Sequence, residues 1–108
     1  MSGRVNKFGA VKTTIDGITF ASKREGKYYA DLKLMERAGE IHALELQPRF
    51  KCTVNGVKVC SYVADFAFRE KDGRYRVWDV KGVETPVFKL KKKLMKAVYP
   101  HITVEIVK

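Results

Sequence analysis

Acidic residues are scarce in this 108-residue sequence: 12 Asp and Glu stand against 22 Lys and Arg, which leaves a formal net charge of +10. Such an excess of positive charge repels itself in a compact chain unless a polyanion neutralises it, so nucleic acid is the first partner to expect. A basic chain can also bind acidic lipid, but the sequence contains neither an amphipathic membrane anchor nor a lipidation signal.

Long hydrophobic runs are missing as well. No segment approaches the ~18 apolar residues of a membrane span. The first residues are basic but lack the apolar stretch of a secretion signal. We therefore expect no contact with a membrane and a cytoplasmic location.

Cysteine is limited to Cys52 and Cys60, on either side of a predicted two-residue turn at Asn55-Gly56. With that turn, Cys52 faces Val59, and the two thiols point to opposite faces of the sheet. This register argues against a disulfide, and two sulfurs without nearby His or Cys make no zinc site. We interpret both as small buried apolar residues in a reducing compartment.

The sequence does have the composition of a folded domain, with 45% hydrophobic and 11% aromatic residues. Its length is typical of one domain. We expect a single domain over residues 1–108, in which residues 1–11 are flexible.

Hydrophobic periodicity and turn residues predict an ordered series of elements along the chain. Ser22 and Glu25 form a capping box at the start of the first helix, and Thr85-Pro86 is a favourable start for the second. The expected elements are a hairpin over 11–20, a helix from 22 to about 38, strands over 44–54, 57–68 and 74–81, a helix from 86 to about 98, and a strand over 102–106. The order predicts an α/β (α+β) fold in which helices flank a mixed sheet.

Two acids lie inside apolar strands, where aspartate is rare: Asp65 in YVADF and Asp79 in VWDVK. A buried carboxylate costs several kcal/mol unless it is paired or bound to a metal. Asp79 and Lys81 share a strand face, because side chains alternate. A three-residue turn at residues 71–73 sets Asp65 opposite Asp79, whereas a two-residue turn makes the acids face apart; Gly73 favours the three-residue turn.

This trio has two interpretations. In the first, Lys81 neutralises two strand acids in a structural salt bridge. In the second, Asp65 and Asp79 bind Mg²⁺, which needs few protein ligands and keeps several waters. A metal-bound water oriented by Lys81 could then attack a phosphodiester. Glu25 caps its helix, and its place on the inward stripe also directs it toward the sheet.

Four motifs in sequence order resemble those of the PD-(D/E)XK nuclease superfamily. They are Ser-x-x-Glu-x-x-Tyr at residues 22–28, Leu-Gln-Pro-x-Phe at 46–50, Tyr-x-Ala-Asp-Phe at 62–66 and Asp-Val-Lys-Gly at 79–82. The resemblance extends in particular to a family of small uncharacterised phage-encoded proteins, to transposon end-cutting nucleases and to small junction resolvases. Ala64 replaces the proline of the superfamily name, at a position that carries no chemistry.

The resemblance implies a restriction-endonuclease-like core and assigns roles to four residues. Asp65 and Asp79 match the metal-binding acids, Lys81 the lysine of the motif and Glu25 the first-helix glutamate that takes part in the metal site. Gln47 is either an edge residue before Pro48 or a group that contacts DNA. The implied cofactor is Mg²⁺, with Mn²⁺ able to substitute.

A run of lysines on the second predicted helix has no acidic partners. Lys89, Lys92, Lys93 and Lys96 recur at helical spacing, opposite an expected buried stripe of Val87, Leu90, Leu94 and Val98. Such a face is either simply solvated or binds phosphates, and Lys23 could extend it. Contacts of this kind carry no sequence code, so selectivity for DNA structure is expected over selectivity for sequence.

The sequence thus predicts a Mg²⁺-dependent DNA endonuclease, selective for branched DNA, acting in phage replication or recombination inside the host cell. A homodimer or a replication or recombination partner is expected, because the chain lacks a separate DNA-recognition domain. The alternative is a non-catalytic DNA-binding module whose strand acids form a structural ion network.

Overall fold

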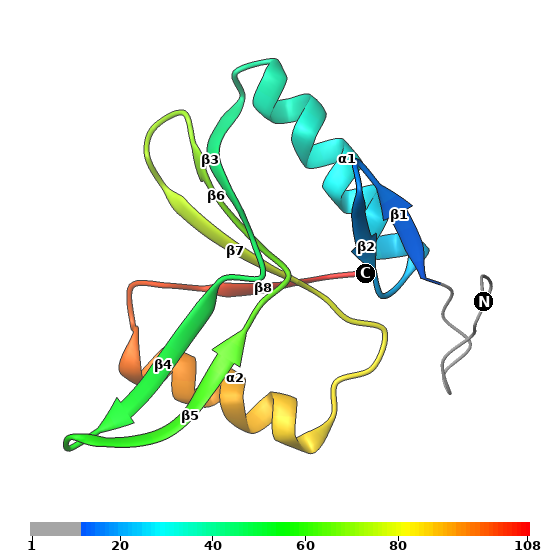
Figure 1. Ribbon diagram of the computed structural model, residues 1–108. Helices are drawn as coiled ribbons and strands as arrows, with labels where there is room; N and C mark the ends of the chain where they lie inside the picture. The colour runs from blue at the N-terminus through cyan, green and yellow to red at the C-terminus, as the bar shows by residue number, and fades with distance from the viewer. Residues whose placement is uncertain (1–11) are drawn as a thin grey trace.

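Figure 1 shows the fold as a computed structural model, which describes residues 12–108. The flexibility expected for residues 1–11 therefore lies outside the described residues. The elements, in order, are β1 (Thr13–Ile15), β2 (Ile18–Phe20), α1 (Lys23–Arg37), β3 (Ile41–Leu46), β4 (Arg49–Val54), β5 (Val57–Val63), β6 (Phe66–Glu70), β7 (Tyr75–Val80), α2 (Pro86–Val98) and β8 (Val104–Val107).

The predicted α+β class is confirmed. The main sheet has the strand order β3-β6-β7-β8, with β8 parallel to β7 and the other pairs antiparallel. The sheet is therefore mixed, and α2 makes the crossover connection that a parallel pair requires. Two separate two-stranded ribbons, β1–β2 and β4–β5, complete the fold.

The two helices cover opposite faces of the main sheet (Figure 1). Leu32 of α1 packs in one core cluster with Phe66 and Phe68, and Met95 of α2 packs in the other with Ala67 and Val77. Neighbouring residues of β6 enter different clusters because strand side chains alternate between faces. The sheet thus forms the middle layer of the molecule.

Helix α1 begins and ends where its sequence predicts. The Ser22 hydroxyl accepts a hydrogen bond from the Glu25 N–H at 3.2 Å, which caps the first turn. Gly39, with φ +77°, follows the C-cap residue Ala38. In the first turns, a Cβ at the buried Gly26 would lie 3.0 Å from Ile15 Cδ1, so glycine lets the β1–β2 ribbon approach the helix closely.

The expected strands over 44–54 and 57–68 are wrong as continuous elements. The first breaks at Gln47-Pro48 and the second at Ala64-Asp65. The segments that belong to the main sheet are β3 and β6, and the remaining segments pair with each other as the separate ribbon β4–β5. Pro48 has no N–H for a ladder, and Gln47 before it takes a left-handed φ of +51°. Hydrogen bonds from Gln47 N to Asp65 O (2.9 Å) and from Ala64 N to Pro48 O (3.1 Å) hold the bend together.

The predicted cysteine register is also wrong. A bulge after Cys52 shifts the pairing by one residue, so that Cys52 lies opposite Cys60 rather than Val59. The extra residue in β5 puts both thiols on one face, and both cysteines are free. Cys52 is fully buried, as expected of a small apolar residue, and Cys60 is partly exposed.

Helix α2 buries only part of the expected stripe: Leu94 and Val98 are partly buried against the core, whereas Val87 and Leu90 are not. Val87 and Leu90 are 64% and 61% exposed, and the buried residues are Phe88 and Met95. The larger Phe88 ring decides how the helix is rotated, because it reaches Tyr62 at a centroid distance of 6.2 Å. Within residues 12–108, no helix is long and apolar enough to cross a membrane.

Candidate metal centre

The centre of the site is a pair of carboxylates, one directly before β6 and the other in the neighbouring strand β7. Glu70 N donates to Arg74 O at 2.9 Å, and Gly73 has φ +90°, so the turn contains residues 71–73 as expected. The β6–β7 ladder ends with Phe66 opposite Trp78. Beyond this pair, Asp65 N donates to Trp78 O at 3.1 Å, and the Asp65 side chain contacts that of Asp79, so the two acids meet as predicted.

Asp79 is the most deeply placed charge of the site, with 1% of its surface exposed. Its Oδ2 accepts a hydrogen bond from the Tyr62 hydroxyl. Its Oδ1 lies 3.4 Å from Lys81 Nζ. Each oxygen therefore has a partner, which offsets the cost of burying the carboxylate.

Asp65 lies at the bend, directly before β6. Its Oδ2 accepts a hydrogen bond of 2.6 Å from Val80 N, which binds its side chain to the neighbouring strand. Burial raises the pKa of Asp65 to about 7; the Val80 N–H opposes this shift, and the charges of Asp79 and Glu25 add to it. Asp65 therefore ionises less readily than an exposed aspartate.

Lys81 is the cation of the site. It follows the end of β7, where its N–H donates to Val107 O at 3.1 Å. Its ammonium lies 4.9 Å from the centroid of the Phe88 ring, and 34% of its side chain is exposed. Lys81 thus bridges the buried Asp79 and the solvent, and it shares a face with Asp79 as predicted.

Glu25 approaches this cluster from the first turn of α1. Burial is the main cause that raises the pKa of Glu25. The charge of Asp79 also raises this pKa and the charge of Lys81 lowers it, so both charges act on the Glu25 carboxylate. Among residues 12–108, however, no three His, Cys, Asp or Glu side chains are close enough to hold a metal ion together. The structure thus brings Asp65 and Asp79 together but does not add Glu25 to them as a third ligand of one group.

The donor set fits Mg²⁺. This ion takes hard oxygen ligands, keeps several waters and is commonly bound through one or two carboxylates. Asp65 and Asp79 would supply those carboxylates, and Glu25, whose pKa responds to the charge of Asp79, would support the ion directly or through water. A divalent cation would also offset the negative charge that raises the pKa of Asp65.

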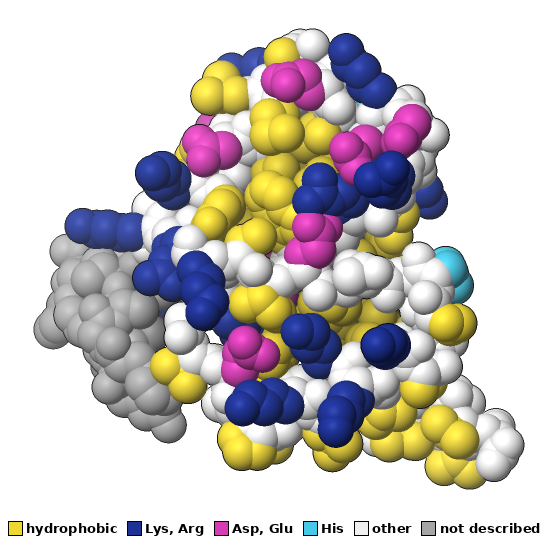
Figure 2. Space-filling view, turned by 180° about the vertical axis from the view of Figure 1, so that it is seen from behind, with side chains coloured by type: hydrophobic (Ala, Val, Ile, Leu, Met, Phe, Trp, Pro, Cys, Tyr) yellow, Lys and Arg dark blue, Asp and Glu magenta, His cyan; other side chains and the backbone are white. Residues whose placement is uncertain are grey.

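The residues expected to contact DNA lie on exposed surfaces. Gln47 is exposed, and its backbone N–H fixes it beside Asp65. Lys23, Lys89, Lys93 and Lys96 are exposed, and Lys92 is half-buried. Figure 2 shows Lys and Arg side chains over both the upper and the lower half of this face, and most of the Asp and Glu side chains lie in its upper half.

Tyr62 is the residue whose part in the site the sequence did not reveal. Strand alternation predicts an inward-facing aromatic, and a buried hydroxyl needs a partner. Only the bend between β5 and β6 brings that hydroxyl to Asp79, 17 residues further along the chain. Burial and the hydrogen bond to Asp79 raise the pKa of Tyr62 far above its ordinary value, so the hydroxyl remains a donor.

The chain belongs to the DUF1064 family, which is described as a protein of unknown function and matches residues 5–108. No curated protein and no solved structure gives a significant match to the chain.

Proposed function

We propose that this member of the DUF1064 family is a Mg²⁺-dependent DNA endonuclease that hydrolyses phosphodiester bonds. One observation carries the proposal: the carboxylates of Asp65, directly before β6, and Asp79, in β7, meet in a largely buried position, with the Lys81 ammonium 3.4 Å from Asp79. In a chain with a net charge of +10, such a concentration of negative charge is suited to a bound cation.

The resemblance to the PD-(D/E)XK superfamily supports the same function. The motif residues Asp65, Asp79 and Lys81 are neighbours in space as well as in order, and Glu25 faces them. We therefore propose that the mixed sheet with its flanking helices is a restriction-endonuclease-like core. Asp65 and Asp79 would hold Mg²⁺, and Mn²⁺ would substitute for it.

Each residue of the site would have its own role in the hydrolysis. The bound metal would supply an acidified water and neutralise charge on the phosphate. Lys81 would orient that water, whose oxygen forms a new bond to phosphorus while the bond to the leaving ester oxygen breaks. The proton lost by the water balances the proton gained by that leaving oxygen. Tyr62 would hold Asp79 in place.

The positive surface supports DNA as the substrate. Phosphate contacts from Lys89, Lys93 and Lys96 would fix position without reading sequence. We propose selectivity for branched DNA in phage replication or recombination, inside the host cell. Because Lys92 is half-buried, its contribution to this surface would be the smallest of the four.

A specific observation favours the alternative of a structural ion network in a non-catalytic DNA-binding module. Both oxygens of Asp79 have partners within the chain, Tyr62 and Lys81, without any metal. If this network is purely structural, removing the Asp79 charge leaves Lys81 under-compensated and costs stability.

The substitution Asp79→Asn distinguishes the proposed nuclease from the non-catalytic DNA-binding module. We expect it to abolish cleavage of a panel of linear, flapped, single-stranded and four-way DNA in Mg²⁺ or Mn²⁺, with EDTA as the blank. DNA binding in Ca²⁺ should be retained, because the amide keeps the shape and removes a charge that repels phosphate.

The matched control is Asp72→Asn, which changes an exposed aspartate in the turn between β6 and β7. It should cleave at the wild-type rate. Full cleavage by Asp79→Asn would exclude this site as the catalytic centre. Lack of cleavage by the well-folded wild type on every substrate would favour the non-catalytic module.

A further inference from the structure

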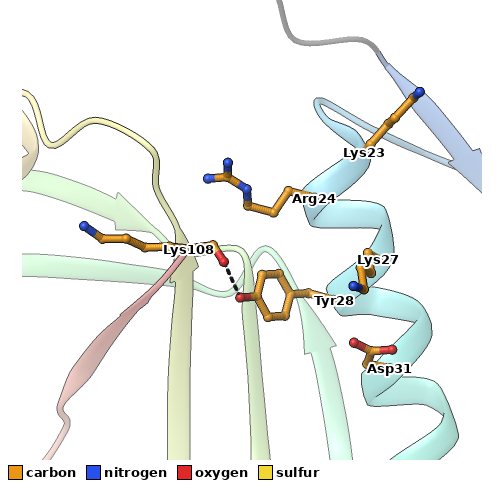
Figure 3. A pocket seen from close by; sticks show the side chains of 6 residues that line it. All are labelled: Lys23, Arg24, Lys27, Tyr28, Asp31 and Lys108. Atoms are coloured by element: carbon orange, nitrogen blue, oxygen red, sulfur yellow. Dashed lines mark hydrogen bonds between the residues drawn. The ribbon is translucent and has the colours of Figure 1, made fainter.

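A second feature lies beside the carboxylates, in the space between α1 and the end of β8. It is a pocket of about 600 Å³, within the range of small-molecule sites. Its lining residues are Lys23, Arg24, Lys27, Tyr28, Asp31 and Lys108, four of which are cationic and one acidic (Figure 3). The pocket is therefore strongly positive.

The cations of this pocket are not neutralised by neighbouring acids. Within the described part of the chain, none of the four takes part in an ion pair shorter than 4 Å. Residues 1–11 contain no Asp or Glu. Asp31 lies further along α1 than Arg24, so an anion is favoured at the Arg24 end of the pocket (Figure 3).

The floor of the pocket is fixed by a contact between distant parts of the chain. The Tyr28 hydroxyl donates to the backbone oxygen of Lys108 at 2.6 Å. The Tyr28 ring packs edge-on against Trp78, with a centroid distance of 5.7 Å. The ring is therefore held rigidly while the cations around it are exposed.

The pocket adjoins the candidate metal centre. A Cβ on Gly82 would lie 3.6 Å from a terminal nitrogen of Arg24, so the guanidinium reaches the residue after Lys81. Lys81 N donates to Val107 O, which places the lysine of the metal centre beside the strand that ends at the pocket. Arg24 and Glu25 are adjacent in the chain, and Glu25 faces the acidic pair.

We infer that this pocket binds a second phosphate of the DNA strand whose scissile phosphate lies at Asp65 and Asp79, with Arg24 as its main ligand. A guanidinium suits this role because it donates two parallel hydrogen bonds to phosphate oxygens. The inference rests on the proposed function for the identity of the strand. The phosphate is either a terminal monoester or an internal diester, which share this chemistry.

The test measures binding in EDTA, so that it does not depend on cleavage. Short single-stranded oligonucleotides of one sequence would carry a 5′-phosphate, a 3′-phosphate or no terminal phosphate. Arg24→Gln is compared with Arg37→Gln, which removes one exposed cation from the last turn of the same helix. Melting curves would verify that both variants fold.

We expect Arg24→Gln to weaken binding by about tenfold, which corresponds to removal of one charge-assisted hydrogen-bonding group. Arg37→Gln should weaken binding less than about twofold. If Arg24→Gln loses affinity for only one of the phosphorylated oligonucleotides, the pocket binds a terminal monoester. If it loses affinity equally for all three oligonucleotides, the pocket binds an internal diester. Equal effects of the two substitutions would overturn the inference.

Failure of the proposed function gives a different result. If the wild type cleaves no DNA in Mg²⁺ but Arg24→Gln still weakens binding in EDTA, the pocket binds phosphate and the nuclease assignment is wrong.

Discussion

At the residue scale, the buried Asp79 shows how the chain keeps a charge inside its core. A carboxylate with 1% exposure needs a donor or a cation for each oxygen, and Tyr62 and Lys81 supply them. Asp79 has one cation, Lys81, whereas Asp65 forms no ion pair among residues 12–108 and accepts a hydrogen bond from the Val80 N–H. That imbalance makes the pair suited to a metal ion.

Tyr62→Phe tests the hydrogen bond to Asp79. The substitution removes only the hydroxyl and leaves a buried acceptor without its donor, so we expect the free energy of unfolding to fall by about 1–3 kcal/mol. Denaturant unfolding would measure this decrease. Metal affinity should fall as well, because Asp79 would be less firmly oriented.

The control is Tyr75→Phe, since the hydroxyl of Tyr75 makes no hydrogen bond found among residues 12–108. Its unfolding free energy should change little. Equal decreases in the two variants would mean that the Tyr62 hydroxyl has no special role.

The raised pKa of Asp65 predicts how stability depends on pH. Its folded pKa of about 7 exceeds the ordinary value of 3.8, so between these values the folded chain holds a proton that the unfolded chain has released. The contribution of Asp65 to stability is therefore complete below about pH 4 and is lost as the pH rises through 7.

Asp65→Asn should flatten the pH dependence of the unfolding free energy between pH 5 and pH 8, relative to the wild type. Asp72→Asn should leave it unchanged. Added Mg²⁺ should raise the stability of the wild type at pH 8, which is above the pKa of Asp65. A wild-type profile that Asp65→Asn does not alter would show that other groups control this range.

At the element scale, helix α2 separates its packing side from its charged side. Phe88 and Met95 are buried, and Lys89, Lys93 and Lys96 are exposed. Lys91 departs from the charged side, because its ammonium donates to Ser61 O at 3.1 Å and ties α2 to β5. Three exposed lysines on successive turns form a surface that fits a phosphate backbone.

Replacing Lys89, Lys93 and Lys96 together by Gln should weaken DNA binding and flatten its salt dependence. For duplex DNA, each phosphate that is no longer neutralised should reduce the slope of log affinity against log salt by ~0.9. The slope would be measured by anisotropy titrations at several salt concentrations in Ca²⁺. The matched variant with Arg at the same three positions keeps the charge and should keep the slope. An unchanged slope in the Gln variant would identify this face as merely solvated.

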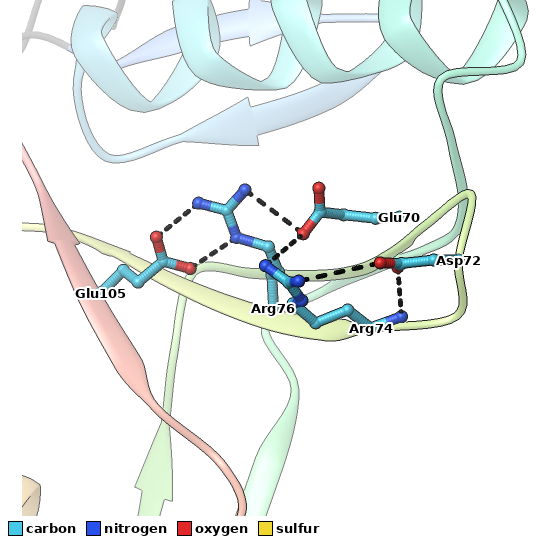
Figure 4. A network of polar contacts seen from close by, with 5 residues as sticks. All are labelled: Glu70, Asp72, Arg74, Arg76 and Glu105. Carbon is cyan, nitrogen blue, oxygen red and sulfur yellow. Dashed lines mark hydrogen bonds and ion pairs between the residues drawn. The ribbon is translucent and has the colours of Figure 1, made fainter.

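At the scale of the whole molecule, acids and bases are unevenly distributed. Figure 4 shows Glu70, Asp72 and Glu105 gathered around Arg74 and Arg76. Arg76 Nε lies 2.7 Å from a Glu105 oxygen, which links β7 to β8. Because many of the acids lie in this network and in the metal centre, the start of α1 and the outer side of α2 are left positive.

This imbalance predicts that salt stabilises the free protein. Raising NaCl from about 0.01 M to about 0.15 M shortens the Debye length from about 30 Å to about 8 Å and screens the repulsion of a chain with net charge +10. Tm should therefore rise, as measured by calorimetry. The Gln variant of α2, with three fewer positive charges, should show a smaller rise. A falling Tm would mean that ion pairs such as Arg76–Glu105 outweigh the repulsion.

The helices, the final strands and the turn at residues 71–73 follow from the sequence, although the strands over 44–54 and 57–68 do not continue as predicted. Local signals are sufficient for these, because Ser22 and Thr85 cap their helices and Gly73 favours the turn that brings Asp65 near Asp79. Alternation along a strand then places Asp79 and Lys81 on one face.

The bend, the bulge and the rotation of α2 arise only in the folded molecule. They depend on interactions between distant residues: Phe88 against Tyr62, the β5 strand against α2, and Gln47 hydrogen-bonded to Asp65. The spacing of apolar residues within α2 does not show which of them will contact the rest of the fold, so Val87 and Leu90 are exposed while Leu94 and Val98 of the same predicted stripe are partly buried. The same long-range packing brings Tyr62 to Asp79 and forms the hydrogen bond between Tyr28 and Lys108 at the floor of the pocket.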